Sequence, residues 1–146
     1  MSKAPSDPPA TLGCLEHSQH HVLVVEDDNM VRDLAVRQLH SLGFGVIQAP
    51  DAESGFRALC ERPEINLLFT DIELGQMSGI DLAAAARRLR PDLRILLTSG
   101  SISEKWIEAC NLDQDVKFLA KPYRLRDLTE SLRRLLVTCP LKSGPP

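Results

Sequence analysis

The sequence predicts an α/β domain built around a parallel sheet, and two observations predict it. Between residues 22 and 137, five short apolar runs alternate with amphipathic stretches of helical periodicity. The first, third and fourth runs have almost continuous apolar cores, which is typical of strands buried on both faces. Since connections between parallel strands are right-handed, we expect helices on both faces of the sheet.

The expected elements are short and follow one another closely. Strands are predicted at residues 22–25, 44–47, 65–69, 95–97 and 116–119, of which the second is the weakest. Helices are predicted at residues 31–42, 52–59, 80–89, 103–110 and 125–136. Asp51 and Ser78 stand where the second and third helices need an N-cap, and Gly43 stands where the first helix should end.

The length of 146 residues suits one domain with a real core. We expect this domain at residues 21–138. Residues 1–20, which are rich in Pro, Ser and His, and residues 139–146 have no periodicity, so we expect them to be flexible tails.

Composition narrows the function classes. The net charge of -3 gives no reason to expect binding to nucleic acid or to an anionic membrane. No run approaches the roughly 18 apolar residues of a membrane span. The four cysteines form no CxxC pair, which argues against a disulfide framework or a zinc site, and Cys60 and Cys110 are predicted to be small buried apolar residues. Reduced thiols favour a cytoplasmic location.

Polar side chains follow four of the five expected strands. Glu26 and Asp27 follow the first strand, Asp71 the third, Thr98 the fourth and Lys121 the fifth. Ligands of open parallel sheets bind outside the carboxyl ends of the strands, so these residues are candidates for one site. Carboxylates that lie close together repel each other unless a cation intervenes, and Mg²⁺ prefers carboxylate and water oxygens.

The same residues suit phosphoryl transfer. An Asp carboxylate can form an acyl phosphate as a covalent intermediate. Transfer to it needs mainly positioning and neutralisation of the phosphoryl oxygens, which a divalent cation and an ammonium group supply. Taken alone, the acidic run at residues 26–28 would be interpreted as a solvated loop with helix-capping acids. Its combination with Asp71, Thr98 and Lys121, each after a strand and in this order, favours a phosphoryl-transfer site.

These elements resemble the site of the response-regulator receiver family. The resemblance rests on four segments, VVEDD at 24–28, DIELGQMSG at 71–79, LLTSG at 96–100 and FLAKPY at 118–123, and it covers roughly residues 22–137. It implies a receiver-like (flavodoxin-like) fold: a five-stranded parallel sheet with strand order 2-1-3-4-5 and five helices on both faces.

The resemblance also implies a role for each residue. Asp71 would accept a phosphoryl group from a kinase phosphohistidine, while Lys121 and Thr98 contact its oxygens. Mg²⁺ or Mn²⁺ would be held by Asp71, Asp27, Glu26 and the backbone carbonyl of Glu73. Thr98 and Phe118 would form the conformational switch, although a plain core role for Phe118 is equally open.

Three positions of the loops bear on this resemblance. Glu26 stands where the family more often has Asp, and its longer side chain changes how an ion is held. Gly75 replaces the usual proline of the loop after Asp71, which favours a more mobile turn. The peptide between Lys121 and Pro122 is expected to be cis, as is usual in the family.

The leading interpretation is a single-domain phosphoacceptor of a two-component system, and not a turnover enzyme. A receiver fragment of a hybrid histidine kinase and a phosphorelay carrier stay open. An aspartate-nucleophile phosphatase is disfavoured, because the acidic run lacks the Asp-x-Asp pattern, and a binding module without phosphorylation is disfavoured by the complete site. Expected partners are a cognate histidine kinase or phosphotransfer protein and a downstream protein on the fourth helix–fifth strand–fifth helix face, with the chain a monomer or weak homodimer.

Overall fold

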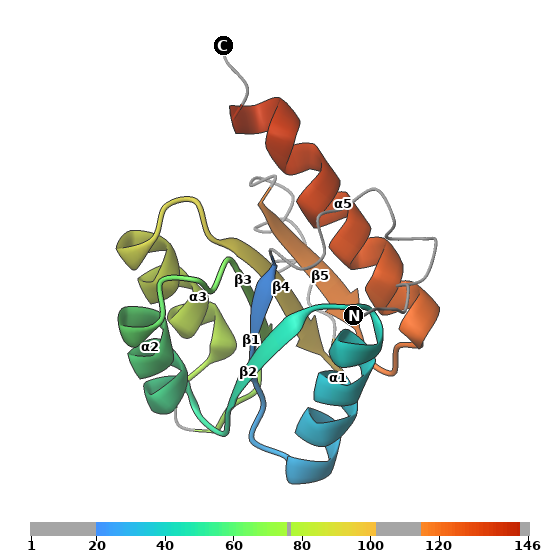
Figure 1. Cartoon of the computed structure of the whole chain (residues 1–146). Helices are drawn as coiled ribbons and strands as arrows, with labels where there is room; N and C mark the ends of the chain where they lie inside the picture. The colour runs from blue at the N-terminus through green and yellow to red at the C-terminus, as the bar shows by residue number, and fades with distance from the viewer. Residues whose placement is uncertain (1–19, 76, 102–114, 144–146) are drawn as a thin grey trace, which may run out of the picture.

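The computed structural model describes residues 20–75, 77–101 and 115–143. Five parallel strands form one sheet in the order β2-β1-β3-β4-β5 (Figure 1). The strands are β1 (His21–Val25), β2 (Gly45–Ala49), β3 (Leu67–Asp71), β4 (Arg94–Ser99) and β5 (Val116–Ala120). The predicted fold class and strand order are therefore confirmed.

Helices cover both faces of this sheet, as predicted (Figure 1). Helices α1 (Asn29–Ser41) and α5 (Leu125–Ser143) pack on one face, and α2 (Ala52–Glu61) and α3 (Gly79–Leu89) pack on the other. The fourth predicted helix, at residues 103–110, lies outside the described residues. The backbone of α5 stays helical to Ser143, so this helix extends beyond the domain boundary predicted at residue 138.

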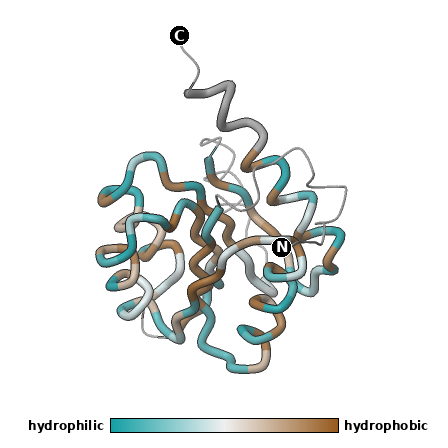
Figure 2. Tube along the Cα trace, viewed as in Figure 1, coloured by the Kyte–Doolittle hydropathy of each residue, from teal (hydrophilic) through white to brown (hydrophobic). Residues whose placement is uncertain are grey.

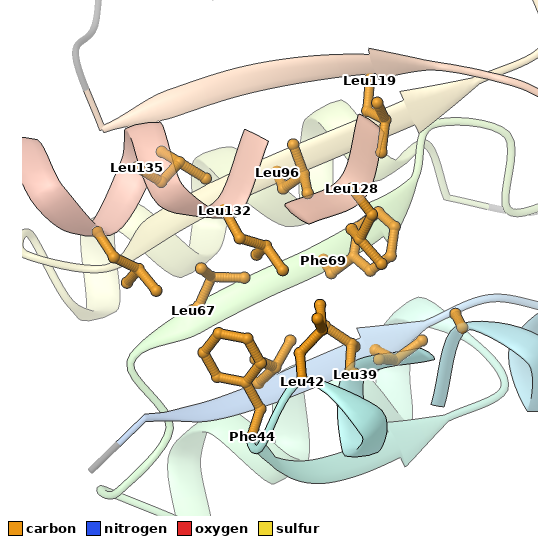
Figure 3. Close-up of a cluster of buried hydrophobic side chains, with 14 of the residues drawn as sticks. Leu39, Leu42, Phe44, Leu67, Phe69, Leu96, Leu119, Leu128, Leu132 and Leu135 are labelled. Atoms are coloured by element: carbon orange, nitrogen blue, oxygen red, sulfur yellow. The ribbon is translucent and has the colours of Figure 1, made fainter. Parts of the chain in front are cut away.

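Each helical layer buries its own apolar cluster against the sheet. Figure 2 shows the apolar residues concentrated along the central strands. The cluster under α1 and α5 brings Leu39 and Leu132 onto Leu67 and Phe69 of β3 (Figure 3). All five residues of β3 are buried, which explains why the central strand carries an almost unbroken apolar sequence up to its polar end.

Polar residues start the helices where the sequence predicts caps. The side chain of Asp51 accepts the backbone N–H of Ser54 at 2.8 Å, and Ser78 accepts that of Ile80 at 2.9 Å. Gly43 follows α1 with a φ of 96°, a conformation that favours glycine, so its predicted role in ending that helix is confirmed.

One burial prediction is wrong. Cys60 is exposed on α2, although it was predicted to be buried. The buried positions of α2 are Ala52, Gly55 and Leu59, which follow one face of the helix. Cys60 comes directly after Leu59, and one step along a helix rotates the side chain by about 100°, away from that face. Cys110 lies outside the described residues.

Among the described helices, none is both long and apolar enough to cross a membrane.

Candidate functional site

The predicted site residues meet at the carboxyl ends of four adjacent strands. β1 and β3 are direct neighbours, and Asp71 pairs with Thr98 in the ladder between β3 and β4. Lys121 follows β5, and its backbone N–H donates to the carbonyl oxygen of Ser99 at 2.9 Å. Asp71 is the last residue of β3 and Thr98 lies within β4, so both belong to strands that continue further than the sequence predicts.

Three carboxylates form the centre of this site. Ligand atoms of Glu26, Asp27 and Asp71 all lie within 4.8 Å of one another. Glu26 is 4% exposed and Asp71 is 6% exposed, whereas Asp27 is exposed to solvent. The predicted convergence of these acids is thus a feature of the structure.

The ammonium group of Lys121 lies between the two buried carboxylates. Its Nζ is 2.9 Å from Oδ2 of Asp71 and 3.1 Å from Oε1 of Glu26. Burial by itself lowers the pKa of Lys121, but the hydrogen bonds to Asp71 and Glu26 outweigh it, so the pKa lies above its ordinary value. The site therefore holds a permanent positive charge at neutral pH.

Glu26 is held on both of its carboxylate oxygens. Oε2 accepts the backbone N–H of Asp28 at 3.1 Å, while Oε1 accepts Lys121. Burial is the largest influence on its pKa and raises it, against the hydrogen bonds from Asp28 and Lys121, and the negative charge of Asp71 adds to the rise. A further cation at this position would relieve that cost.

The carboxylate of Asp71 is oriented by two donors. Oδ1 accepts the backbone N–H of Glu73 at 3.0 Å, and Oδ2 accepts Lys121. The hydroxyl of Thr70 donates to the backbone carbonyl oxygen of Asp71 at 3.0 Å. Both the side chain and the backbone of Asp71 are therefore fixed, which is the positioning that a nucleophilic carboxylate needs.

Thr98 brings a buried hydroxyl that has no hydrogen-bond partner within the described part of the chain. The residue is 3% exposed and lies beside Asp71 in the ladder. A buried polar group without a partner is costly, so such a group calls for an explanation. An oxygen atom of a ligand bound at Asp71 could accept a hydrogen bond from this hydroxyl.

Phe118 is half-buried in β5 and packs against the apolar cluster under α2 and α3. This contact fits a core role, and its predicted role as a switch residue stays a prediction. The peptide between Lys121 and Pro122 is cis, as predicted.

The donor set fits the hard divalent cation that the sequence predicts. Three carboxylates converge on a small volume, two of them are buried, and burial of Glu26 disfavours a free negative charge there. Carboxylate oxygens are the ligands that Mg²⁺ and Mn²⁺ prefer. Together these residues could hold a cation next to an oriented Asp71, opposite a lysine and a hydroxyl, which is an arrangement for receiving a phosphoryl group.

The sequence analysis missed Arg32, which contacts the acidic loop at residues 26–28. The guanidinium of Arg32 in α1 donates to the backbone carbonyl oxygen of Glu26 at 2.8 Å. Arg32 belongs to the amphipathic pattern of its helix, and a surface arginine of this kind is usually solvated, so only the spatial path of the loop reveals the contact.

Comparisons with known proteins show the family of this chain. The family model for the response regulator receiver domain matches residues 22–133. The response regulator receiver protein CpdR of Brucella abortus is 34% identical over 116 residues, which cover 80% of this chain and 96% of CpdR. The sensor kinase CckA of the same organism is 31% identical over 118 residues, which cover 79% of this chain and 12% of CckA.

A solved structure shows the same fold. The crystal structure of a CheY-like response regulator receiver domain protein from Methanospirillum hungatei superposes with a TM-score of 0.76 at 30% sequence identity. The match covers 87% of this chain and all of the other.

Proposed function

Because this chain belongs to the response regulator receiver domain family, we propose that it is a phosphoacceptor of two-component signal transduction, with Asp71 as the acceptor. One observation carries the proposal: Asp71 is buried, oriented by Glu73 and Lys121, and lies beside a hydroxyl without a partner in the described residues. In the transfer, the P–N bond of a donor phosphohistidine breaks and an O–P bond forms at a carboxylate oxygen of Asp71. The imidazole of the donor keeps the electron pair of the broken bond.

The residues around Asp71 would divide the work. Lys121 neutralises one phosphoryl oxygen, and Thr98 donates its hydroxyl to another. Asp71, Asp27, Glu26 and the backbone carbonyl of Glu73 would hold Mg²⁺ or Mn²⁺, directly or through water. When bound, such an ion neutralises charge on the phosphoryl group.

The phosphoryl donor is proposed to dock over the start of α1. Two apolar side chains are exposed there, Met30 at 82% and Leu34 at 55%. Leu34 also lines a cavity of about 480 Å³ together with Lys121 and Tyr123. An apolar surface that reaches the lysine of the site suits a partner helix carrying the histidine, because exposed apolar patches commonly mark interaction sites.

The output would be a change of shape and not a released product. On phosphorylation, the hydroxyl of Thr98 gains an acceptor, and we propose that Phe118 turns into the space this opens. Such a change is a population shift between two packings. A downstream protein would recognise the new packing on the surface formed by β5, α5 and the segment before β5. Residues 102–114 of that segment lie outside the described part of the chain.

The chain is proposed to work in the cytoplasm, as a monomer or weak homodimer, in a single-receiver arrangement. The match to CpdR supports the single-receiver arrangement, because it spans nearly all of that receiver protein. The match to 12% of the sensor kinase CckA supports the alternative, a receiver fragment of a hybrid kinase or a phosphorelay carrier.

The test is phosphorylation of the purified chain by acetyl phosphate with Mg²⁺, followed by mass spectrometry of the intact protein. We expect a gain of one phosphoryl group that is lost in Asp71→Ala and on chelation of the metal. Asp33→Ala is the matched control, because Asp33 is an exposed carboxylate paired with Arg37 on α1. Absence of any gain in the native chain, or a gain that persists in Asp71→Ala, would refute the proposal. Multiple-turnover hydrolysis of a phosphomonoester such as p-nitrophenyl phosphate would favour the phosphatase alternative.

A further inference from the structure

Arg32 joins three segments around the acidic loop. Its Nη1 donates to the carbonyl oxygen of Glu26 at 2.8 Å and its Nη2 donates to Oδ1 of Asn29 at 2.6 Å. Its Nε donates to Oε1 of Gln48 at 3.1 Å. The end of β1, the start of α1 and the neighbouring strand β2 are therefore connected through one planar guanidinium group, which holds its donors in a fixed geometry.

These contacts act on the peptide that joins two of the site's acids. The carbonyl group of Glu26 belongs to the same planar unit as the backbone N–H of Asp27, so fixing one fixes the other. The preceding N–H of Glu26 is also held, because it donates to the carbonyl oxygen of Ala49 at 3.2 Å. With both peptide units of Glu26 held, the direction in which its side chain leaves the backbone and the position of Cα of Asp27 are set.

We propose that Arg32 is a positioning residue for the divalent cation, an inference that rests on the proposed function. It contacts the backbone of the acidic loop and not the ion, and it presets the carboxylates of Glu26 and Asp27 opposite Asp71. Outer partners that orient ligands in this way commonly change metal affinity by about 10-fold or more. The opposite influence is also physical, because a guanidinium charge near the site repels a cation.

The sign of the effect of removing Arg32 therefore decides between positioning and repulsion. We would titrate Mg²⁺ into native, Arg32→Ala and Arg32→Lys protein by calorimetry, below the onset of thermal unfolding of every variant. Arg32→Ala is expected to weaken binding about 10-fold. Arg32→Lys should fall between Arg32→Ala and native, because one ammonium group replaces only part of a three-way contact. Arg37→Ala is the control, since Arg37 lies on the same helix with an exposed partner, Asp33, and its Kd should stay at the native value.

Phosphorylation by acetyl phosphate gives a second readout that a general loss of stability would not produce. In Arg32→Ala, the Mg²⁺ concentration for half-maximal rate should rise by the same factor as the Kd, while the rate at saturating Mg²⁺ stays near native. If Arg32→Ala does not fold, Gln48→Ala removes only the contact to β2 and should weaken Mg²⁺ binding by a smaller factor.

Three results would overturn the inference. They are native Mg²⁺ affinity in Arg32→Ala and Gln48→Ala, tighter binding in Arg32→Ala, and a fall in the saturating rate with an unchanged Kd. Failure of the proposed function is distinguishable. A native chain that binds Mg²⁺ but gains no phosphoryl group refutes the phosphoacceptor role, and the calorimetric series still judges Arg32. A native chain that binds no divalent cation refutes both.

Discussion

Gly79, the first residue of α3, lies against the backbone at the end of β3, and replacing it with alanine should disturb Asp71 directly. The N–H of Gly79 donates to the carbonyl oxygen of Ile72 at 2.7 Å. A Cβ atom on Gly79 would stand 2.1 Å from the carbonyl oxygen of Asp71 and 2.8 Å from Cα of Ile72. Gly79 has no positive φ, so the reason for glycine here is space and not conformation.

The size of the effect follows from these distances. Carbon–oxygen contacts settle near 3.3 Å, so the start of α3 and the end of β3 must separate by about 1.2 Å. Both sides of the contact are backbone, and overpacking of this kind costs roughly 1–3 kcal/mol, with the upper end expected here. A displacement of about 1 Å at a reacting group can lower a rate about 100-fold.

Urea unfolding followed by far-ultraviolet circular dichroism would measure the free energy of unfolding of Gly79→Ala. Phosphorylation by acetyl phosphate would measure its rate in the same preparation. Gly100→Ala is the control for stability, because a Cβ atom on Gly100 would meet no atom within 4 Å, and its free energy should change by less than about 0.5 kcal/mol. If Gly79→Ala were as stable as native and were phosphorylated at the native rate, the steric argument would be wrong.

Two further predictions concern stability. Burial raises the pKa of Tyr123 to about 12, so the unfolded chain ionises this phenol first as pH rises from 10 to 12, which costs the native protein up to about 2.7 kcal/mol of stability. Lys121, whose pKa is also raised, adds its own loss at high pH. In chemical unfolding at each pH, Tyr123→Phe should therefore lose less stability than the native chain, by up to about 2.7 kcal/mol. The guanidinium of Arg90 donates to four backbone carbonyls at the end of α2 and in the loop before β3. Arg90→Met should therefore cost about 2–3 kcal/mol in urea unfolding, whereas Arg88→Met, on the exposed face of α3, should cost almost nothing, and equal effects would contradict this role.

Strand ends were the part of the secondary structure that the sequence predicted least well. The third strand was expected to end at Phe69 but continues to Asp71, and the fourth continues past Leu97 to Ser99. Apolar patterning stops at the first polar side chain, whereas the ladder is made by backbone groups that pair regardless of side-chain polarity. The consequence is functional, because Asp71 and Thr98 are held inside the sheet and not on a loop.

For the site, the sequence predicted which residues take part but not which of them are in contact. Glu26, Asp27, Asp71, Thr98 and Lys121 were predicted from their positions after apolar runs, since carboxyl ends of parallel strands face one edge. The 2.9 Å contact between Lys121 and Asp71 joins residues 50 positions apart, and no local pattern contains it.

By itself the sequence determined the α/β class, the helix caps and the set of polar residues that could carry chemistry, because apolar periodicity and capping are properties of neighbouring residues. Only the tertiary structure decided which of those groups touch, that the hydroxyl of Thr98 is buried without a partner in the described residues, and that Arg32 holds the acidic loop. Such contacts depend on how strands pair and where loops pass, and both are set by packing of the whole domain and not by any segment within it.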